Sequence, residues 1–243
     1  MTVHPDLTGQ TAIVTGGGRG IGRAIALALG RCGVQVIVSA RTKSQIEDVA
    51  KEILHAGGMS DFIPCDLADE DQIKQVFDFT IKKFGRLDIL VNNAAIGRYG
   101  PFADFSGSDL NDLLSINIRG TYLFCQKALQ IMIPEKSGYI INISSVVGIK
   151  GYENQSAYTA TKHAIVGMTK VLAVEAQPHN IRASLIHPGG VDTDLVGQAR
   201  PDLDRSILLK PEDIAQTVLF LLSLPERAAI DEIYIRRRGS SPF

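Results

Sequence analysis

The sequence predicts a single α/β domain, spanning residues 1–243, built on a doubly wound parallel sheet of about seven strands. Short apolar segments alternate with longer segments of helical periodicity along the whole chain. This alternation, with strands that are apolar throughout, is typical of a parallel sheet covered by helices on both faces. The length of 243 residues suits one such domain, and no repeat, low-complexity segment or linker divides the chain.

The apolar segments have the length of buried strands, and the segments between them have the length of helices. We expect strands at residues 10–15, 34–39, 60–64, 87–91, 138–143, 180–186 and 231–235. We expect helices near residues 20–32, 43–56, 69–84, 108–133, 156–177 and 211–223. Ligands of such a sheet bind beyond the carboxyl ends of its strands, where the strand order reverses.

Charge and cysteine content argue against several classes of function. With a net charge of −1 and no basic block or tail, the chain is not expected to bind nucleic acid or a membrane surface. We interpret the one basic cluster, Arg236–Arg238, as a solvated edge or a subunit contact. Cys32, Cys65 and Cys125 match no metal-ligand spacing, which predicts reduced thiols, a cytoplasmic protein and no metal site. No apolar segment resembles a signal or a membrane span.

The first expected strand leads into a glycine-rich turn, residues 16–22, and then into a helix rich in alanine and leucine. Glycines permit a tight turn and a close approach of the backbone to a pyrophosphate. The amino terminus of the helix offers free N–H groups and a positive dipole end to the same phosphates. The segment therefore predicts a dinucleotide site, with cofactor contacts from Gly16, Gly18, Arg19, Gly20, Ile21 and Gly22.

The end of the second expected strand bears on the choice of cofactor. An acidic residue there would bind the adenosine ribose and repel a 2′-phosphate. This chain has Ser39 and Ala40 at that place, followed by Arg41. Arg41 and Arg19 suit a phosphate through charge and forked geometry, although both could be ordinary surface arginines. We therefore expect NADP(H) rather than NAD(H).

Tyr158 and Lys162 stand four residues apart in an expected helix, so they share one face. A free phenol titrates near pH ~10, and an ammonium beside it lowers its pKa. Ser145 follows the strand expected at 138–143 and could present a hydroxyl to the same place. This set predicts proton transfer to or from a carbonyl oxygen. The alternative is an ordinary pair of exposed helix residues.

Seven motifs together resemble the short-chain dehydrogenase/reductase family, in order and spacing, from Leu7 to Leu224. The motifs are Thr15-Gly16-x-x-x-Gly20-x-Gly22, Cys65-Asp66-Leu67, Asn92-Asn93-Ala94-Ala95, Asn117, Ser145, Tyr158-x-x-x-Lys162 and Pro188-Gly189. The resemblance implies a Rossmann-like fold and hydride transfer between a nicotinamide cofactor and a carbonyl carbon. One departure is Ala95, where the family usually has glycine.

The resemblance also implies residue roles. Tyr158 would be the general acid/base, Ser145 would hydrogen-bond the substrate oxygen, and Lys162 would lower the tyrosine pKa and bind the nicotinamide ribose. Asn117 would hold a water that returns the proton, and would kink its helix. Ser144 is an alternative to Ser145, and we interpret His163 and His187 as structural. Further cofactor contacts are expected from Asp66, Leu67, Asn93, Tyr158, Lys162, Pro188, Gly189, Val191 and Thr193.

The expected substrate is a small carbonyl compound or the corresponding alcohol. The segment between Thr193 and Pro211 is short, which suggests an open site that could also admit the acyl carrier protein of a 3-oxoacyl carrier-protein reductase. Such a partner is acidic, and Lys136 and His179 are the basic residues expected at the entrance.

Other classes remain as alternatives. They are a non-catalytic dinucleotide-binding sensor, a sugar-nucleotide epimerase and a scaffold. We also expect a homo-oligomer, a dimer or a tetramer, packed through the helices near 108–133 and 156–177. The C-terminal region lacks the Val-Asp-Gly-Gly turn found in many family members, which makes the dimer the more secure expectation.

Overall fold

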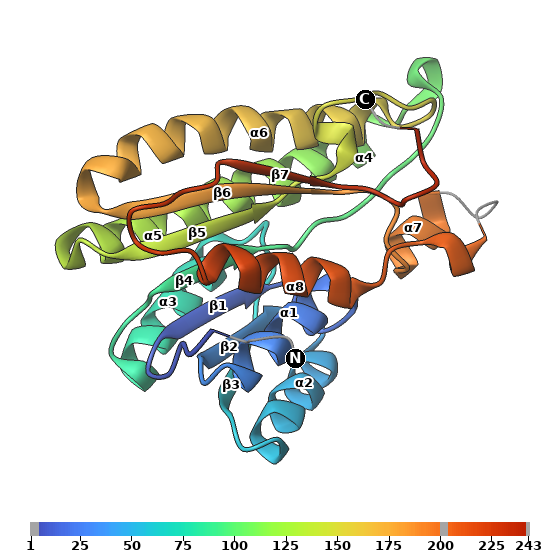
Figure 1. Cartoon of the computed structure of the whole chain (residues 1–243). Helices are drawn as coiled ribbons and strands as arrows, with labels where there is room; N and C mark the ends of the chain where they lie inside the picture. The colour runs from blue at the N-terminus through green and yellow to red at the C-terminus, as the bar shows by residue number, and fades with distance from the viewer. Residues whose placement is uncertain (1–4, 200–203, 242–243) are drawn as a thin grey trace.

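Seven parallel strands form one sheet in the computed structural model, which describes residues 5–199 and 204–241 (Figure 1). The strands are β1 (Thr11–Thr15), β2 (Gln35–Ala40), β3 (Met59–Pro64), β4 (Ile89–Asn92), β5 (Gly138–Ile143), β6 (Ile181–Pro188) and β7 (Glu232–Ile235). Their spatial order is β3-β2-β1-β4-β5-β6-β7. The order reverses between β1 and β4, which opens a crevice beyond the carboxyl ends of these two strands.

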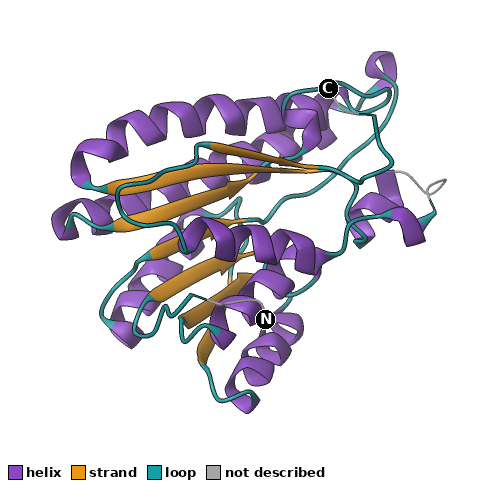
Figure 2. Cartoon of the chain, in the orientation of Figure 1, coloured by secondary structure: helices purple, strands orange, loops and turns teal. Residues whose placement is uncertain are grey.

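Helices cover both faces of the sheet (Figure 2). The helices are α1 (Gly20–Arg31), α2 (Lys43–His55), α3 (Glu70–Phe84), α4 (Gly107–Leu113), α5 (Thr121–Glu135), α6 (Ser156–Ala176), α7 (Asp194–Ala199) and α8 (Pro211–Leu222). On one face, Ala12 and Val14 of β1 pack in a cluster with residues of α1, α2 and α8, whereas Ile13 packs on the other face with residues of α3, α5 and α6. Both faces are therefore buried, which explains why the strands are apolar without alternation.

The doubly wound α/β fold is confirmed, with two local differences from the predicted elements. The helix expected at 108–133 is divided: a π-helical turn, Leu114–Gly120, separates α4 from α5. The short helix α7, in the segment after β6, was not predicted. None of the helices in the described ranges has the length and hydropathy needed to cross a bilayer.

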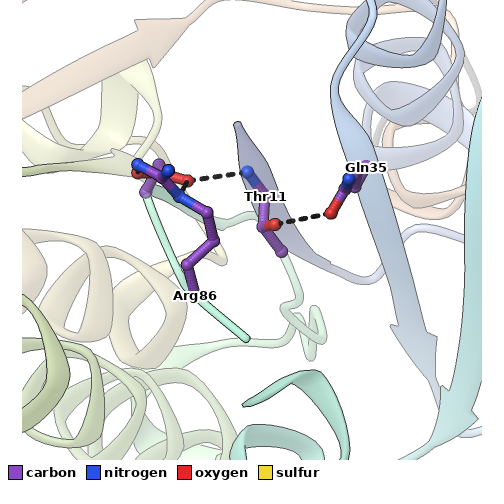
Figure 3. Close-up of polar contacts among 4 residues, drawn as sticks. Thr11, Gln35 and Arg86 are labelled. Atoms are coloured by element: carbon purple, nitrogen blue, oxygen red, sulfur yellow. Dashed lines mark hydrogen bonds and ion pairs between the residues drawn. The ribbon is translucent and has the colours of Figure 1, made fainter. Parts of the chain in front are cut away.

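Polar side chains fasten the amino edge of the sheet (Figure 3). The backbone N–H of Thr11 donates to the Asp88 carboxylate at 2.8 Å, and the Thr11 hydroxyl donates to Gln35 Oε1 at 3.1 Å. Arg86 donates to both oxygens of Asp88, at 2.8 and 2.7 Å. These contacts hold the starts of β1, β2 and β4 together, at the edge opposite the crevice.

Candidate active site

A cleft of about 530 Å³ opens at the carboxyl edge of the sheet. It is lined by residues that follow β1 to β6 and by the first turns of α6. Of the residues predicted from sequence, the lining includes Gly16, Gly18, Arg19, Gly20, Ile21, Arg41, Asp66, Leu67, Asn93, Ser145, Tyr158, Lys162, Pro188, Gly189, Val191 and Thr193. Gly22 and Asn117 lie behind this lining. The structure therefore brings together segments separated by most of the chain.

The glycine turn has the geometry that its sequence predicts. Gly16 and Gly20 have φ values of +63° and +53°, in the left-handed region that favours glycine. A Cβ on Gly22 would lie 2.3 Å from the Gly16 carbonyl oxygen and 2.5 Å from the Asn93 amide nitrogen. Gly22 is thus needed for close packing inside the turn.

Two polar side chains join the glycine turn to β4. The Thr15 hydroxyl accepts hydrogen bonds from the backbone N–H groups of Asn93 and Ala94, at 3.0 and 3.1 Å. The Asn93 amide donates to the carbonyls of Thr15 and Gly16, at 3.1 and 3.3 Å. Ala95, in the same segment, does not have a positive φ, so its methyl group causes no backbone strain.

Substituting Gly22 by alanine is expected to lower the free energy of unfolding by about 2 kcal/mol and to weaken dinucleotide binding, because the new methyl group would meet the Gly16 backbone. Chemical denaturation and a fluorescence titration with NADPH would measure both effects. Gly167→Ala on α6 is the matched control, because a Cβ there meets nothing within 4 Å. Equal stability and affinity of the two variants would contradict this account of the turn.

Tyr158 and Lys162 lie in the first turns of α6 and are almost fully buried, with 7% and 4% of their surface exposed. Lys162 Nζ lies 5.7 Å from the centre of the Tyr158 ring and donates to the Ile143 carbonyl at 3.0 Å. Ser145 follows β5, and its Oγ accepts a hydrogen bond from the Val147 N–H at 3.3 Å. Ser144 is directed elsewhere, since its hydroxyl donates to the Lys162 carbonyl. Ser145 is therefore better placed than Ser144 to meet a substrate.

Burial is the largest influence on the pKa values of Tyr158 and Lys162. Burial lowers the pKa of Lys162 to about 8. Burial also raises the pKa of Tyr158 above its ordinary value, and the neighbouring Tyr99 adds to this. The expected lowering of the Tyr158 pKa by Lys162 is therefore not found here, because burial is the main influence and it disfavours the charged phenolate. Tyr158 holds its proton at neutral pH.

Asn117 lies in the π-helical turn, where the sequence predicted a kink. Its side chain is buried, with Oδ1 accepting from the Ile96 N–H at 2.9 Å. Its Nδ2 donates to the Ile96 carbonyl at 3.0 Å and to the Thr161 hydroxyl at 3.2 Å. The side chain thus fastens the segment after β4 to α6. Single π-turns inside helices occur frequently at functional sites.

Tyr99 is a neighbour of the site that sequence reasoning missed. Its ring meets the Tyr158 ring edge-on, with 5.7 Å between the centroids and 71° between the planes. Burial raises the pKa of Tyr99 to about 12, so its phenol stays neutral. The sequence does show an aromatic residue after β4. Its contact with Tyr158 could not be predicted, because the two residues lie far apart in the sequence. The apolar cluster around Tyr158 also contains Ile96, Leu113, Phe105, Val146, Val147 and Leu195.

The arginines at the cleft differ in their partners. Arg19 forms an ion pair with Asp194 at 2.8 Å, and both side chains are mostly exposed. Arg205 pairs with Asp192. Arg41 lines the cleft and forms no ion pair with the described residues. Of the two predicted phosphate ligands, Arg41 is therefore the one whose guanidinium has no ion-pair partner among the described residues. Sequence reasoning did not find Gln45, Asp194 or Arg205, which also line the cleft.

The expected basic entrance is not formed by Lys136 and His179 of the same chain. Lys136 ends α5 just before β5, and His179 lies in the 3-10 turn Gln177–His179 just before β6. Both residues stand at the amino edge of the sheet, and the cleft opens at the carboxyl edge. The sequence expectation is wrong within one chain because each residue precedes its strand instead of following it.

Comparison with known proteins agrees with this architecture. Residues 10–204 match the family model for short chain dehydrogenases. The chain is 34% identical to a 3-oxoacyl-[acyl-carrier-protein] reductase of Thermotoga maritima, covering 89% of this chain and 92% of that protein. It is 36% identical to the protein of the same name from a Synechocystis species, covering 92% and 93%. It is 37% identical to (+)-borneol dehydrogenase 2 of Salvia officinalis, covering 89% and 84%.

Solved structures show the same likeness. A metagenomic short-chain oxidoreductase in complex with NADP superposes with a TM-score of 0.85 at 33% identity, covering 97% of this chain and 100% of that one. An alcohol dehydrogenase from Thermococcus sibiricus, complexed with 5-hydroxy-NADP, superposes with a TM-score of 0.89 at 26% identity, covering 96% and 99%. With the strand order, the glycine turn and these matches together, the chain belongs to the short-chain dehydrogenase/reductase family of NAD(P)-dependent oxidoreductases.

Proposed function

We propose that this protein is an NADP(H)-dependent reductase that converts a ketone or aldehyde carbonyl into an alcohol. The observation that supports the proposal is that Ser145, Tyr158 and Lys162 line the same cleft as the glycine turn. The residues present also fit the cofactor. The glycine turn, which has no room for a Cβ atom at Gly16, lines the cleft, and so does Arg41, whose guanidinium has no ion-pair partner among the described residues. A bound nicotinamide would supply the hydride.

In this proposal the protein positions the carbonyl and moves one proton. Tyr158 is protonated at neutral pH, because burial raises its pKa, so it starts as the acid in carbonyl reduction. Its proton passes to the oxygen of the developing alkoxide, and the Ser145 hydroxyl donates a hydrogen bond to the same oxygen. The Lys162 ammonium, 5.7 Å from the ring centre, stabilises the phenolate that remains. Asn117 would hold a water molecule through which a proton returns to Tyr158.

We propose one set of cleft residues for the adenosine and phosphate part of the cofactor and another set for its nicotinamide. Arg41 would bind the 2′-phosphate, Asp66 the adenine, and Gly16 to Ile21 the pyrophosphate through backbone N–H groups. Residues Pro188 to Thr193 would contact the nicotinamide.

Arg41→Ala is expected to lower kcat/KM with NADPH by roughly 10- to 100-fold, because a hydrogen bond between charged groups contributes about 1.5–3 kcal/mol. The value with NADH should change little, since NADH has no 2′-phosphate. Steady-state kinetics with both cofactors would measure the ratio. Arg19→Ala is the matched control, and it should have the smaller effect because Arg19 is paired with Asp194. An equal fall with NADPH and NADH would contradict the role of Arg41.

A 3-oxoacyl carrier-protein reductase is the second candidate, and two relatives with that name favour it. Consumption of NADPH and NADH with simple ketones, aldehydes and 3-oxoacyl thioesters would separate the two functions. Turnover confined to 3-oxoacyl thioesters would favour the carrier-protein reductase. Tight NADPH binding without turnover on any carbonyl would instead favour the sensor that the sequence left open.

We also propose that the protein is a cytoplasmic homo-oligomer. Exposed apolar side chains lie on the helices beside the sheet: Leu110, Leu114, Tyr122, Val171 and Val174. The most exposed of them is Val174 of α6, at 71%. Contact with a second copy would bury these residues. Light scattering after size-exclusion chromatography would show a monomer if the proposal is wrong.

A further inference from the structure

His187 stands behind the catalytic serine, at the carboxyl end of β6, and is only 1% exposed. Its ring nitrogen Nδ1 lies 3.2 Å from the backbone carbonyl oxygen of Ser145. Its other nitrogen, Nε2, lies 3.3 Å from a carboxylate oxygen of Glu232 on β7. The other carboxylate oxygen of Glu232, Oε1, lies 3.1 Å from Nζ of Lys170 on α6. This buried imidazole contacts two polar groups, one of which belongs to the proposed active site. Its role is therefore more than to fill space in the core.

The contact with Ser145 defines the state of Nδ1. A carbonyl oxygen can only accept a hydrogen bond, so Nδ1 must bear the hydrogen and donate it. The Nε2 contact with Glu232 has the distance of an ion pair but not the alignment of a hydrogen bond. The bond from Nδ1 is therefore the contact that fixes the serine backbone.

The position of His187 explains why a side chain makes this link. The Ser144 N–H donates to the Ile186 carbonyl at 2.8 Å, at the end of the pairing between β5 and β6. Pro188 follows and has no N–H, so the backbone pairing cannot continue. The His187 side chain supplies the next link between β6 and the segment after β5. The Ser145 carbonyl also accepts the Gly148 N–H at 2.8 Å, so both of its lone pairs are engaged.

We propose that His187 is a positioning residue, which fixes the Ser145 backbone through Nδ1 and so directs the serine hydroxyl into the cleft. This inference rests on the proposed role of Ser145 in carbonyl reduction. Ser145 has an extended backbone, with φ −172° and ψ 164°, and its peptide plane leads directly into the turn Val146–Gly148. Rotation of that plane would move the hydroxyl, and misplacement by about 1 Å can cost roughly 100-fold in rate.

Two substitutions separate positioning from packing. His187→Leu removes the donor and is expected to lower kcat by about 10- to 100-fold, with little change in KM or in NADPH affinity. His187→Asn keeps an N–H at the atom that corresponds to Nδ1, and it should restore most of the lost kcat. Glu232→Gln is the control that leaves the bond to Ser145 intact, and its kcat should stay near that of the wild type.

A double-mutant cycle tests whether His187 acts through the serine. In the Ser145→Ala background, His187→Leu should cause no further loss of kcat, because the group that it positions is already absent. Equal losses of kcat in the presence and absence of the serine hydroxyl would overturn the proposal. Equal losses in the Leu and Asn variants would overturn it as well.

Hydrogen exchange gives a readout that needs no substrate. The amides of Val147 and Gly148 donate to Ser145, at 3.3 and 2.8 Å. They should exchange faster in His187→Leu than in the wild type, and at the wild-type rate in His187→Asn. Unchanged exchange in His187→Leu would refute the positioning role. Absence of turnover in the wild-type protein would instead refute the proposed function, so the two failures are distinct.

Discussion

Replacing Tyr158 by phenylalanine is expected to lower kcat by about 10³-fold, within the range that general acid–base catalysis contributes. Affinity for NADPH should change little, because the ring that borders the cleft remains. The free energy of unfolding should be unchanged or slightly higher. The Tyr158 hydroxyl forms no hydrogen bond with the described residues, so removing it leaves no partner unpaired.

Pre-steady-state and steady-state kinetics with the best carbonyl substrate would measure the loss, and a thermal melt would test the stability. Tyr99→Phe is the matched control, because it removes the hydroxyl of the other ring in the same pair. Its kcat should stay within about tenfold of the wild type, since Tyr99 transfers no proton in the proposed reaction. Retained activity in Tyr158→Phe would refute the proposed acid.

Lys162→Met is expected to abolish most activity and, at pH 7, to gain about 3 kcal/mol of stability because no charge is buried, less about 1–3 kcal/mol because the Ile143 carbonyl loses its donor. The stabilisation follows from the pKa of Lys162, which burial lowers from 10.5 to about 8. At pH 7 the ammonium is charged in both the folded and the unfolded chain, so folding bears the full cost of burying it. The methionine side chain has a similar length and no charge to bury.

The pKa of Lys162 determines how the difference in stability between Lys162→Met and the wild type changes with pH. Above about pH 8 the folded wild type loses the Lys162 proton first, while the unfolded chain keeps it up to about 10.5. The unfolded chain then binds more protons, so wild-type stability rises with pH across this window. The advantage of Lys162→Met should therefore shrink from pH 7 to pH 10. Denaturation at several pH values would measure it, with Lys82→Met on the exposed surface of α3 as the control. A constant difference would contradict the lowered pKa.

The features that sequence predicted are those formed by neighbouring residues. The glycine turn follows from consecutive residues, and the shared face of Tyr158 and Lys162 follows from four-residue spacing within one helix. The strands were found because burial on both faces makes each one a short apolar run. In each case the relevant physics lies within a single element or its immediate flanks.

The features that sequence missed depend on where separate elements come to lie. The pairing of Arg19 with Asp194, and of Tyr99 with Tyr158, joins residues with no local relation. Lys136 and His179 were placed at the wrong edge for the same reason. The pKa of Tyr158 was expected to fall because helix spacing shows the nearby charge and does not show the extent of burial.

The bracing of the glycine turn has a consequence for the order of folding. The hydroxyl of Thr15 binds the N–H of Asn93, which lies 78 residues later in the chain. The glycine turn is therefore unbraced until β4 has docked beside β1, and closing so long a loop is slow compared with forming the local β1–α1–β2 unit. A nascent chain that ends before β4 has the glycines of the turn but lacks the contacts that brace them. Cofactor binding would then report that β4 has docked beside β1, and it would add stability only from that moment.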